Sequence, residues 1–220
     1  IGARLGEANA LSSLGDVHLG EGDEANALLL YQQAADLYHT LGLPNDEANA
    51  LNRIADVYTR REDHPAALSW YTRALGLAPN NPMWHRNRAL LYLKYLHDAD
   101  AARMDLDRAA CLQPDHPYLA LRRGDLAILE QNYPQALIEY QAFIAALPRN
   151  PAGYYGLGLA HLAAGDPQAA LTTYTQALAL TTDPHDTQEA LKDLQALLTC
   201  RPDLPGIQAV LGLLSPPSPE

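Results

Sequence analysis

A phrase of small and large apolar residues recurs along the chain at nearly constant intervals. Each copy has Ala, an aromatic residue or Leu four positions later, and Ala or Phe three positions after that. Spacings of four and three place each trio on one face of a helix, where small residues beside a large one let a neighbouring helix pack closely. The five copies are Ala27/Tyr31/Ala34, Ala67/Tyr71/Ala74, Ala102/Leu106/Ala109, Ala136/Tyr140/Phe143 and Ala170/Tyr174/Ala177. The leading Ala steps by 40, 35, 34 and 34 residues, a length typical of helix–turn–helix repeats, so the pattern predicts five such units.

A second small residue marks the other helix of each unit. It lies twelve positions before the leading Ala, or thirteen in the third copy, and it is Gly15, Ala55, Ala89, Gly124 or Gly158. Pro-x-x-Pro pairs separate the later units at Pro79–Pro82, Pro114–Pro117 and Pro148–Pro151. The first Pro of a pair ends one helix, and the second begins the next at a position where its missing N–H is not needed. Residues 8–182 are therefore predicted to form ten antiparallel helices in five pairs, without a sheet.

These recurring positions resemble the tetratricopeptide repeat, whose pattern joins a Leu-Gly…Tyr first helix to an Ala…Phe second helix and a Pro. The resemblance covers about residues 8–182 and implies an all-α, right-handed superhelical α-solenoid. One departure is Arg88, which stands where the third unit should have an apolar residue. The predicted units are 8–47, 48–81, 82–116, 117–150 and 151–182, followed by C-terminal capping helices in 183–214 and a disordered tail at 215–220.

The start of the chain copies a joint between units. Residues 1–11 align without a gap with residues 41–51, at the 40-residue offset that separates the first two units. We therefore expect residues 1–7 to be the tail of a truncated upstream repeat. The first helix pair should then expose an apolar face that includes some of Ala10, Leu14, Leu28 and Leu29, and this face could support end-to-end self-association. The alternative is a natural N-terminal extension that happens to match.

The 40-residue length of the first units points to particular groups within this repeat family. Their joint, Leu-Gly-x-x-x-(Asp/Gly)-Glu-Ala-Asn-Ala-Leu, resembles those of kinesin light chains and of the C-terminal arrays in bacterial signal-transducing ATPases with numerous domains. This resemblance implies the C-terminal sensor or scaffold part of a larger bacterial, multidomain, cytoplasmic signalling regulator. A self-contained assembly adaptor or co-chaperone is the alternative.

The sequence contains no motif for catalysis, a cofactor or a metal. The eight His residues do not fall into a metal-binding spacing with Cys or acidic residues. Gly156 and Gly158 begin like a dinucleotide loop, but they lie in a predicted helix with no strand before it, so helix packing is the better interpretation. The chain is therefore expected to be non-enzymatic. Two Cys residues are too few for a disulfide framework, and no apolar run reaches the ~18 residues of a membrane span.

Charge argues against nucleic acid and anionic membranes as partners, because the net charge is −11. The charge is unevenly distributed. Residues 1–40 hold one Arg and six acidic residues, whereas residues 81–150 hold eight basic and eight acidic residues. The middle of the array is therefore more positive than its beginning.

Amide and basic residues recur at similar places in the predicted first helices. Asn offers a donor and an acceptor to a peptide backbone, and Arg can bind a carboxylate through two N–H groups. The resemblance implies that first helices line a concave groove that binds a partner protein or peptide, here one with acidic residues. The candidate groove residues are Asn49, Asn52, Arg53, Arg86, Asn87, Tyr118, Arg122 and Tyr155. The alternative is that Arg53–Asp56 and Arg122–Asp125 are ordinary i,i+3 ion pairs on a solvated face.

Overall fold

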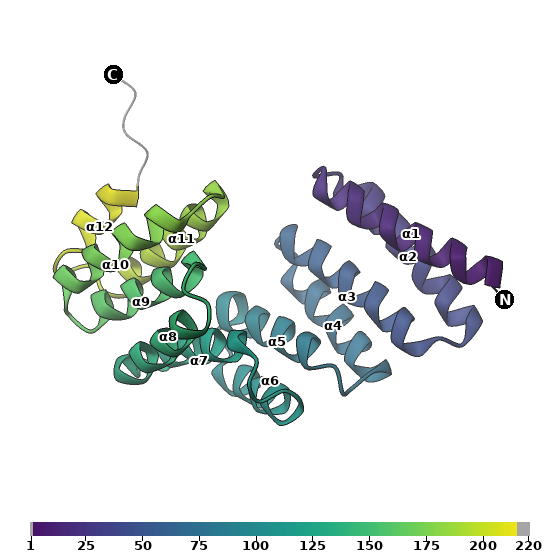
Figure 1. Cartoon of the computed structure of the whole chain (residues 1–220), viewed down its shortest axis with the longest axis horizontal. Coiled ribbons are helices and arrows are strands. Elements are labelled where there is room, and N and C mark those ends of the chain that lie inside the picture. Colours follow the sequence, from purple (N-terminus) through teal and green to yellow (C-terminus); the bar gives the residue numbers. More distant parts are fainter. Residues whose placement is uncertain (1, 215–220) are drawn as a thin grey trace, which may run out of the picture. The chain divides into compact units, whose positions relative to one another are not determined.

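The computed structural model describes residues 2–214, and this part of the chain contains α-helices and one π-helix but no strand (Figure 1). The chain divides into two compact units, Ile1–Pro114 and Asp115–Glu220. Unit 1 contains α1 (Gly2–Gly20), α2 (Glu24–Leu41), α3 (Pro44–Arg60), α4 (His64–Leu77), α5 (Pro82–Leu91), the π-helix η1 (Tyr92–Leu96) and α6 (Ala99–Leu112). Unit 2 contains α7 (Pro117–Leu129), α8 (Tyr133–Ala146), α9 (Pro151–Ala163), α10 (Pro167–Leu180), α11 (Pro184–Cys200) and α12 (Ile207–Leu214). The predicted all-α repeat fold is confirmed, whereas the predicted tail at 215–220 lies outside the described residues.

Each helix packs mainly against its neighbours in sequence. In unit 1, α1 packs on α2, α2 on α3, and so on to α5 and α6. In unit 2, α7 to α10 follow the same order, α11 packs on α9, and α12 packs on α10 and α11. Within each unit, stability is therefore expected to be the sum of helix pairs and their nearest-neighbour interfaces.

The second helix of each repeat begins with the same local structure. A residue with positive φ precedes an Asp or Asn whose side chain accepts a hydrogen bond from the backbone N–H three residues later. This carboxylate or amide satisfies one of the N–H groups that the first helical turn leaves unpaired. The turn residues are Gly22, Glu62, His97, Gln131 and Gly165, and the capping residues are Asp23, Asp63, Asp98, Asn132 and Asp166.

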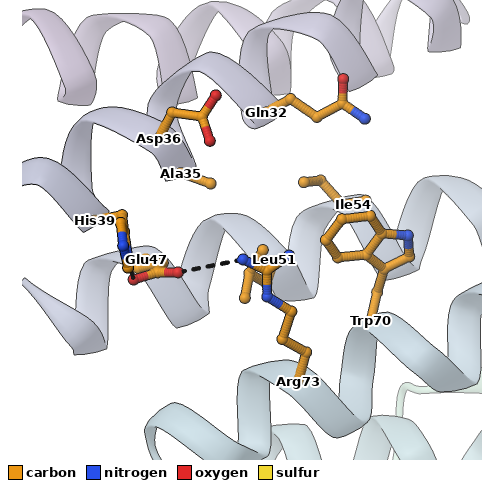
Figure 2. A pocket seen from close by; sticks show the side chains of 9 residues that line it. All are labelled: Gln32, Ala35, Asp36, His39, Glu47, Leu51, Ile54, Trp70 and Arg73. Carbon is orange, nitrogen blue, oxygen red and sulfur yellow. Dashed lines mark hydrogen bonds and ion pairs between the residues drawn. The ribbon is translucent and has the colours of Figure 1, made fainter.

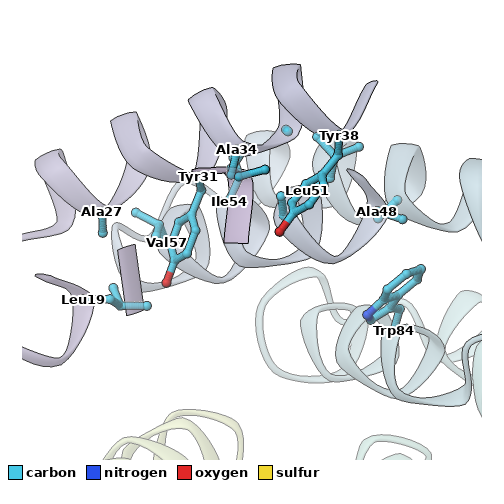
Figure 3. Close-up of a cluster of buried hydrophobic side chains, with 14 of the residues drawn as sticks. Leu19, Ala27, Tyr31, Ala34, Tyr38, Ala48, Leu51, Ile54, Val57 and Trp84 are labelled. Atoms are coloured by element: carbon cyan, nitrogen blue, oxygen red, sulfur yellow. The ribbon is translucent and has the colours of Figure 1, made fainter. Parts of the chain in front are cut away.

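The core of unit 1 explains the pattern of small and large residues. Tyr31 and Tyr38 of α2 lie with Leu51 and Ile54 of α3 in one buried cluster (Figure 3). A Cβ atom at Gly15 would come within 2.6 Å of the Tyr31 ring, which is closer than real Cβ contacts allow. The small residue therefore permits the close approach of α1 and α2 that the spacing predicts.

The first helix of the third repeat departs from the prediction. It is α-helical only to Leu91 and continues as η1. In a π-helix, backbone hydrogen bonds join residues five positions apart instead of four. The sequence holds the physical reason, because thirteen rather than twelve residues separate Ala89 from Ala102. The π-helix absorbs this one additional residue, and apolar spacing alone does not predict this change of helix type.

Two predicted boundaries also differ from the structure. The predicted division between residues 47 and 48 falls inside α3, which begins at Pro44. In the matching segment at the start of the chain, α1 already begins at Gly2 rather than near residue 8. Pro44 disfavours a helical conformation for Leu43, whereas Arg4 occupies the equivalent position in the first copy and permits a helix. Ile1 lies outside the described residues.

Candidate functional site

Polar side chains connect the first helices of unit 1 to one another. Arg53 of α3 reaches Asp16 of α1, with 3.4 Å between Nε and Oδ1. Asn52 of α3 donates to Asp56 on the same helix, at 3.2 Å, and accepts from Asn87 of α5, at 3.4 Å. These contacts place side chains from α1, α3 and α5 on a common polar surface. Arg53 thus pairs with a neighbouring helix, in contrast to the i,i+3 alternative.

A Tyr hydroxyl of the second helix anchors the Asp of the first helix in three repeats, an arrangement that sequence reasoning missed. Tyr31 donates to Asp16 at 2.7 Å, Tyr71 to Asp56 at 2.6 Å, and Tyr140 to Asp125 at 2.8 Å. The signal was available, because all three pairs are fifteen residues apart. Burial raises the pKa of Asp56 and also that of Tyr71, where the nearby Asp56 carboxylate adds to the effect.

In unit 2, two predicted groove residues are held by intramolecular contacts. Arg122 donates to Asp125 at 2.8 Å, which is the i,i+3 pair of the alternative interpretation. Tyr118 is partly exposed, and its hydroxyl accepts from Asn150 at 3.1 Å.

Two other members of the predicted set are buried rather than exposed. Asn52 is enclosed by its bonds to Asp56 and Asn87. Tyr155 belongs to the core of unit 2, where its hydroxyl bonds to Thr181 and Thr187. The candidate groove residue Tyr155 is therefore buried, because α9 turns its ring toward Tyr174 of α10 and Thr187 of α11.

Asn49 lines a hollow of about 410 Å³ beside the joint of α4 and α5. Three further amides, from Asn45, Asn80 and Asn81, share the lining. Trp84 also lines it, and among the described residues its Nε1 has no hydrogen-bond partner, although the atom is buried. The volume lies within the ~300–1,000 Å³ of ligand sites, and the amides suit a peptide backbone.

A smaller pocket of about 100 Å³ lies among α2, α3 and α4. Figure 2 shows Trp70 and the Glu47–Arg73 pair at this pocket, where Arg73 Nη2 lies 3.6 Å from the buried Glu47 carboxylate. His39 Nδ1 contacts the same carboxylate at 3.0 Å. Because its volume is well below the ~300 Å³ lower end of ligand sites, we assign no ligand to this pocket.

Arg88, the departure noted in the sequence, has a structural role. Its guanidinium donates to both oxygens of Asp105, through Nε at 2.7 Å and Nη2 at 2.8 Å, while His85 contacts Asp105 at 2.7 Å. Burial alone would raise the pKa of Asp105, but the bonds from Arg88 and His85 outweigh it and hold that pKa below its usual value. A charged group in place of the usual apolar residue is therefore neutralised inside the third repeat.

The described residues contain no group of three or more His, Cys, Asp or Glu placed to hold a metal ion. Gly156 and Gly158 pack against the rings of Tyr140 and Tyr174, as the packing interpretation predicts. Among residues 2–214, no helix is both long and apolar enough to cross a bilayer.

Comparison with known protein families shows which family this chain belongs to. Two family models described as Tetratricopeptide repeat match the chain, one at residues 6–80 and the other at residues 87–151 and 130–187. The chain belongs to the tetratricopeptide repeat family. The helix pairs from α1 to α10 are therefore the tetratricopeptide repeats of this chain. No curated protein sequence matches the chain.

Solved structures share the fold of this tetratricopeptide repeat protein at low sequence identity. PilW, described as a type IV pilus biogenesis factor, is 17% identical, with a TM-score of 0.71 over 93% of this chain and 98% of PilW. TTC0263 of Thermus thermophilus, described as a thermophilic protein of the same family, is 18% identical, with a TM-score of 0.68 over 86% of this chain and 99% of its own. A chain of the Cut9–Hcn1 structure is 17% identical, with a TM-score of 0.72. The match covers 96% of this chain but only 43% of that longer chain. At these identities the similarity shows the fold alone.

Proposed function

We propose that the chain is a non-enzymatic protein-interaction module that binds an extended, acidic segment of a partner protein on the first-helix surface. The observation that carries this proposal is the amide-lined hollow at Asn49, together with the polar surface of α1, α3 and α5. An extended backbone presents unpaired N–H and C=O groups, and the hollow offers four Asn side chains to it. The oxygens of Asn80 and Asn81 already accept from Arg108 and from the Met83 N–H, so these two amides offer mainly their NH₂ donors.

The Arg residues supply the preference for acidic side chains. Arg53 uses one N–H toward Asp16 at the long distance of 3.4 Å, and half of its side chain is exposed. Arg86 is partly exposed and donates to Gln113 at 3.4 Å. Because a guanidinium group has five donors, a partner carboxylate can bind to each of these residues alongside the contacts they already make. Arg122 belongs to unit 2 and is already engaged by Asp125, so the proposed site is confined to Arg53 and Arg86 of unit 1.

We further infer that the module serves as the C-terminal sensor or scaffold part of a bacterial cytoplasmic signalling regulator. The support is the resemblance of its 40-residue joint to that of signal-transducing ATPases with numerous domains. The two Cys residues, Cys111 and Cys200, are free and exposed, which agrees with a reducing compartment.

The binding proposal can be tested with a displayed library of random 12-residue peptides. We expect acidic, extended sequences to be enriched, and their affinity should fall by about tenfold or more when Arg53 and Arg86 of unit 1 are changed together to Ala. Arg103→Ala is the matched control, because Arg103 is an exposed Arg on α6 that pairs with Asp100. Enriched peptides that bind the Arg53/Arg86 double variant as well as the unchanged chain would contradict the proposal.

A further inference from the structure

The buried ring of His85 on α5 lies between two oxygen atoms. Its Nδ1 is 2.7 Å from Oδ1 of Asp105 on α6, and its Nε2 is 3.0 Å from the carbonyl oxygen of Pro79. Although burial opposes the negative charge, the bonds from Arg88 and His85 hold the pKa of Asp105 below its usual value, so this carboxyl is ionised. A carboxylate and a carbonyl can only accept hydrogen bonds. Both ring nitrogens of His85 therefore face acceptors.

Only the charged form of His85 satisfies both contacts. A neutral imidazole has one N–H, whereas the imidazolium has two and can donate to both oxygens. When one proton is lost, the remaining N–H stays with Asp105, because a hydrogen bond to a carboxylate is stronger than one to a carbonyl. The lone pair of Nε2 then faces the Pro79 oxygen, and the contact becomes repulsive. The His85–Pro79 contact thus depends on the second proton.

The groups around the ring make His85 the member of this cluster that changes charge. Arg88 donates to both oxygens of Asp105 and, through Nη1, to the Thr72 hydroxyl of α4 at 3.1 Å. Tyr92 of η1 lies close enough to interact with the charges of Arg88 and Asp105. The guanidinium of Arg88 does not lose its proton in proteins. One carboxylate therefore serves two cations, and the imidazolium is the one that can become neutral.

Pro79 connects this cluster to the hollow at Asn49. Residues 78–81 form the α4–α5 joint between Leu77 and Pro82, and all four line the hollow. Hydrogen bonds hold two side chains of the joint, because Asn80 accepts from Arg108 at 2.7 Å and Asn81 accepts from the Met83 N–H at 3.0 Å. His85 adds a bond to the backbone of the joint. The charge on His85 therefore influences where the wall of the hollow lies.

We propose that the second proton of His85 regulates partner binding at this hollow: the charged ring holds the α4–α5 joint in the binding form, and the neutral ring releases it. The regulation rests on the proposed function, because its ligand is the extended acidic segment proposed above. The bound form holds one more proton than the released form, so affinity is highest at low pH and falls as the pH rises through the titration of His85. By reciprocity, the bound segment helps His85 to retain its proton. His85 is a positioning residue, since it acts through Pro79.

The first experiment needs no partner. Nitrogen NMR of the full chain, labelled at His and Asn, follows the ring of His85 from about pH 6 to about pH 9, with His85→Gln to assign its signals. We expect two N–H protons on the ring at the lower pH and one at the higher pH. The side-chain amide signals of Asn80 and Asn81 should change with the same midpoint. An unchanged number of ring protons over this range, or amide signals that do not follow the ring, would overturn the proposal.

The second experiment measures binding of a rhodamine-labelled acidic 12-residue peptide from the library described above. Its carboxylates are ionised at both about pH 6 and about pH 9, because Asp and Glu titrate near pH 4. Fluorescence anisotropy with the unchanged chain should show affinity falling by about tenfold between these two values.

Two variants should remove the pH dependence in opposite ways. In Asp105→Asn, the new amide can donate to Nδ1 of a neutral ring while Nε2–H donates to Pro79, so affinity should stay high at both pH values. In His85→Gln, one short amide group cannot make both contacts, so affinity should stay low at both. Circular dichroism at both pH values shows whether each variant is folded. A merely structural role of His85 would weaken binding in both variants alike.

His18→Gln is the matched control, because His18 lies on α1 and contacts Asp23 at 3.3 Å. It should keep the pH dependence of the unchanged chain. Equal affinity of the unchanged chain at both pH values, or a pH dependence that persists in either Asp105→Asn or His85→Gln, would overturn the regulation and leave the proposed function standing. If the library gives no acidic peptide, the proposed function fails instead, and the NMR titration still decides whether the His85 proton controls the joint.

Discussion

At the scale of single residues, the Tyr–Asp pairs provide hydrogen bonds for Asp carboxylates that lie between packed helices. Tyr140 is buried, and its hydroxyl satisfies one oxygen of Asp125 while Arg122 satisfies the other. Asp16 is also paired with Tyr31 and Arg53, although both of these contact its Oδ1 atom. Each pair joins the two helices of a repeat and fixes the Asp side chain on the first-helix surface. The surface that we propose for partner binding is thus held in place from the second helices.

Tyr140→Phe should reveal this role. Removing the hydroxyl leaves one Asp125 oxygen without its donor, which should lower the free energy of unfolding by about 1–3 kcal/mol at pH 7. Urea unfolding measures this change. Tyr154→Phe is the control, because that hydroxyl bonds to the Pro148 carbonyl at an exposed position. An equal loss in both variants would contradict the special role of the Tyr140–Asp125 pair.

The same residue predicts a dependence on alkaline pH. Burial, followed by the nearby Asp125 carboxylate, raises the pKa of Tyr140 well above its usual value of 10.0. The folded state therefore holds this proton more tightly than the unfolded state, so the stabilisation is complete below pH 10 and is lost as the pH rises above it. Between pH 9 and pH 11, the Tyr140→Phe chain should lose less unfolding free energy than the unchanged chain.

Some of this residue-scale structure was predictable and some was not. Tyr140 was recognised as the large member of its helical trio, but its hydroxyl partner was not, because apolar spacing carries no information on polar groups. Burial of Tyr155 was missed for a related reason. Its predicted place on a first helix is correct, but the threonines that bond its hydroxyl lie on segments twenty-six and thirty-two residues away.

At the scale of helices, close packing depends on glycines that have no Cβ to collide with a ring. At Gly124 a Cβ would come within 2.6 Å of the Tyr140 ring, whereas at Gly6 of α1 it would meet nothing within 4 Å. The two positions should therefore respond in opposite ways to the same substitution. Gly6→Ala should stabilise the chain by up to about 1 kcal/mol through helix propensity alone.

Gly124→Ala should destabilise the chain, because an overpacking cost of about 1–3 kcal/mol exceeds that gain in propensity. Thermal unfolding of both variants measures the difference. If Gly124→Ala were as stabilising as Gly6→Ala, the ring would have to move at little cost, and the close approach of α7 and α8 would not depend on glycine.

The π-helix η1 gives a second prediction at this scale. Because it absorbs one additional residue, deletion of Lys94 should restore the twelve-residue interval between Ala89 and Ala102 and allow a continuous α-helix. The unfolding midpoint should then stay within a few degrees of that of the unchanged chain, since the deletion removes an irregularity. Deletion of Arg60 from α3 is the control, because that repeat already has the regular interval and should lose substantial stability. Similar losses in both chains would contradict the one-residue explanation.

The helix pattern was predictable because its signals are local and repeated. Apolar spacing and Pro positions predicted the five helix pairs from α1 to α10 and their order along the chain. Boundaries were less accurate, since the division at residue 47 followed the repeating phrase rather than Pro44, which begins α3. The helix type at η1 was not predictable, because the sequence does not show where the backbone accommodates the one extra residue. A bulge at several positions between Ala89 and Ala102 would have restored the same spacing.

At the scale of the whole molecule, a repeat protein transmits stability only through neighbouring helices. The end of unit 2 is covered by α12, whose Ile207, Val210 and Leu214 lie in the same buried cluster as Tyr174 of α10. Full burial of such side chains contributes about 1.5–3 kcal/mol each. α12 therefore covers apolar side chains of α10 and α11, and its removal should affect these adjacent helices first.

A chain that ends at Leu204 should show how far this effect reaches. Loss of α12 exposes the cluster around Tyr174, so the helices of unit 2 should unfold at lower temperature, and far-UV circular dichroism should show an earlier transition. Both tryptophans, Trp70 and Trp84, lie in unit 1, several repeats from α12, so their fluorescence should keep its midpoint. Residues 215–220 can be removed alone as the control, which should leave both signals unchanged. If fluorescence and dichroism shifted together, unfolding would be cooperative over the whole chain, and the nearest-neighbour description would fail for this protein.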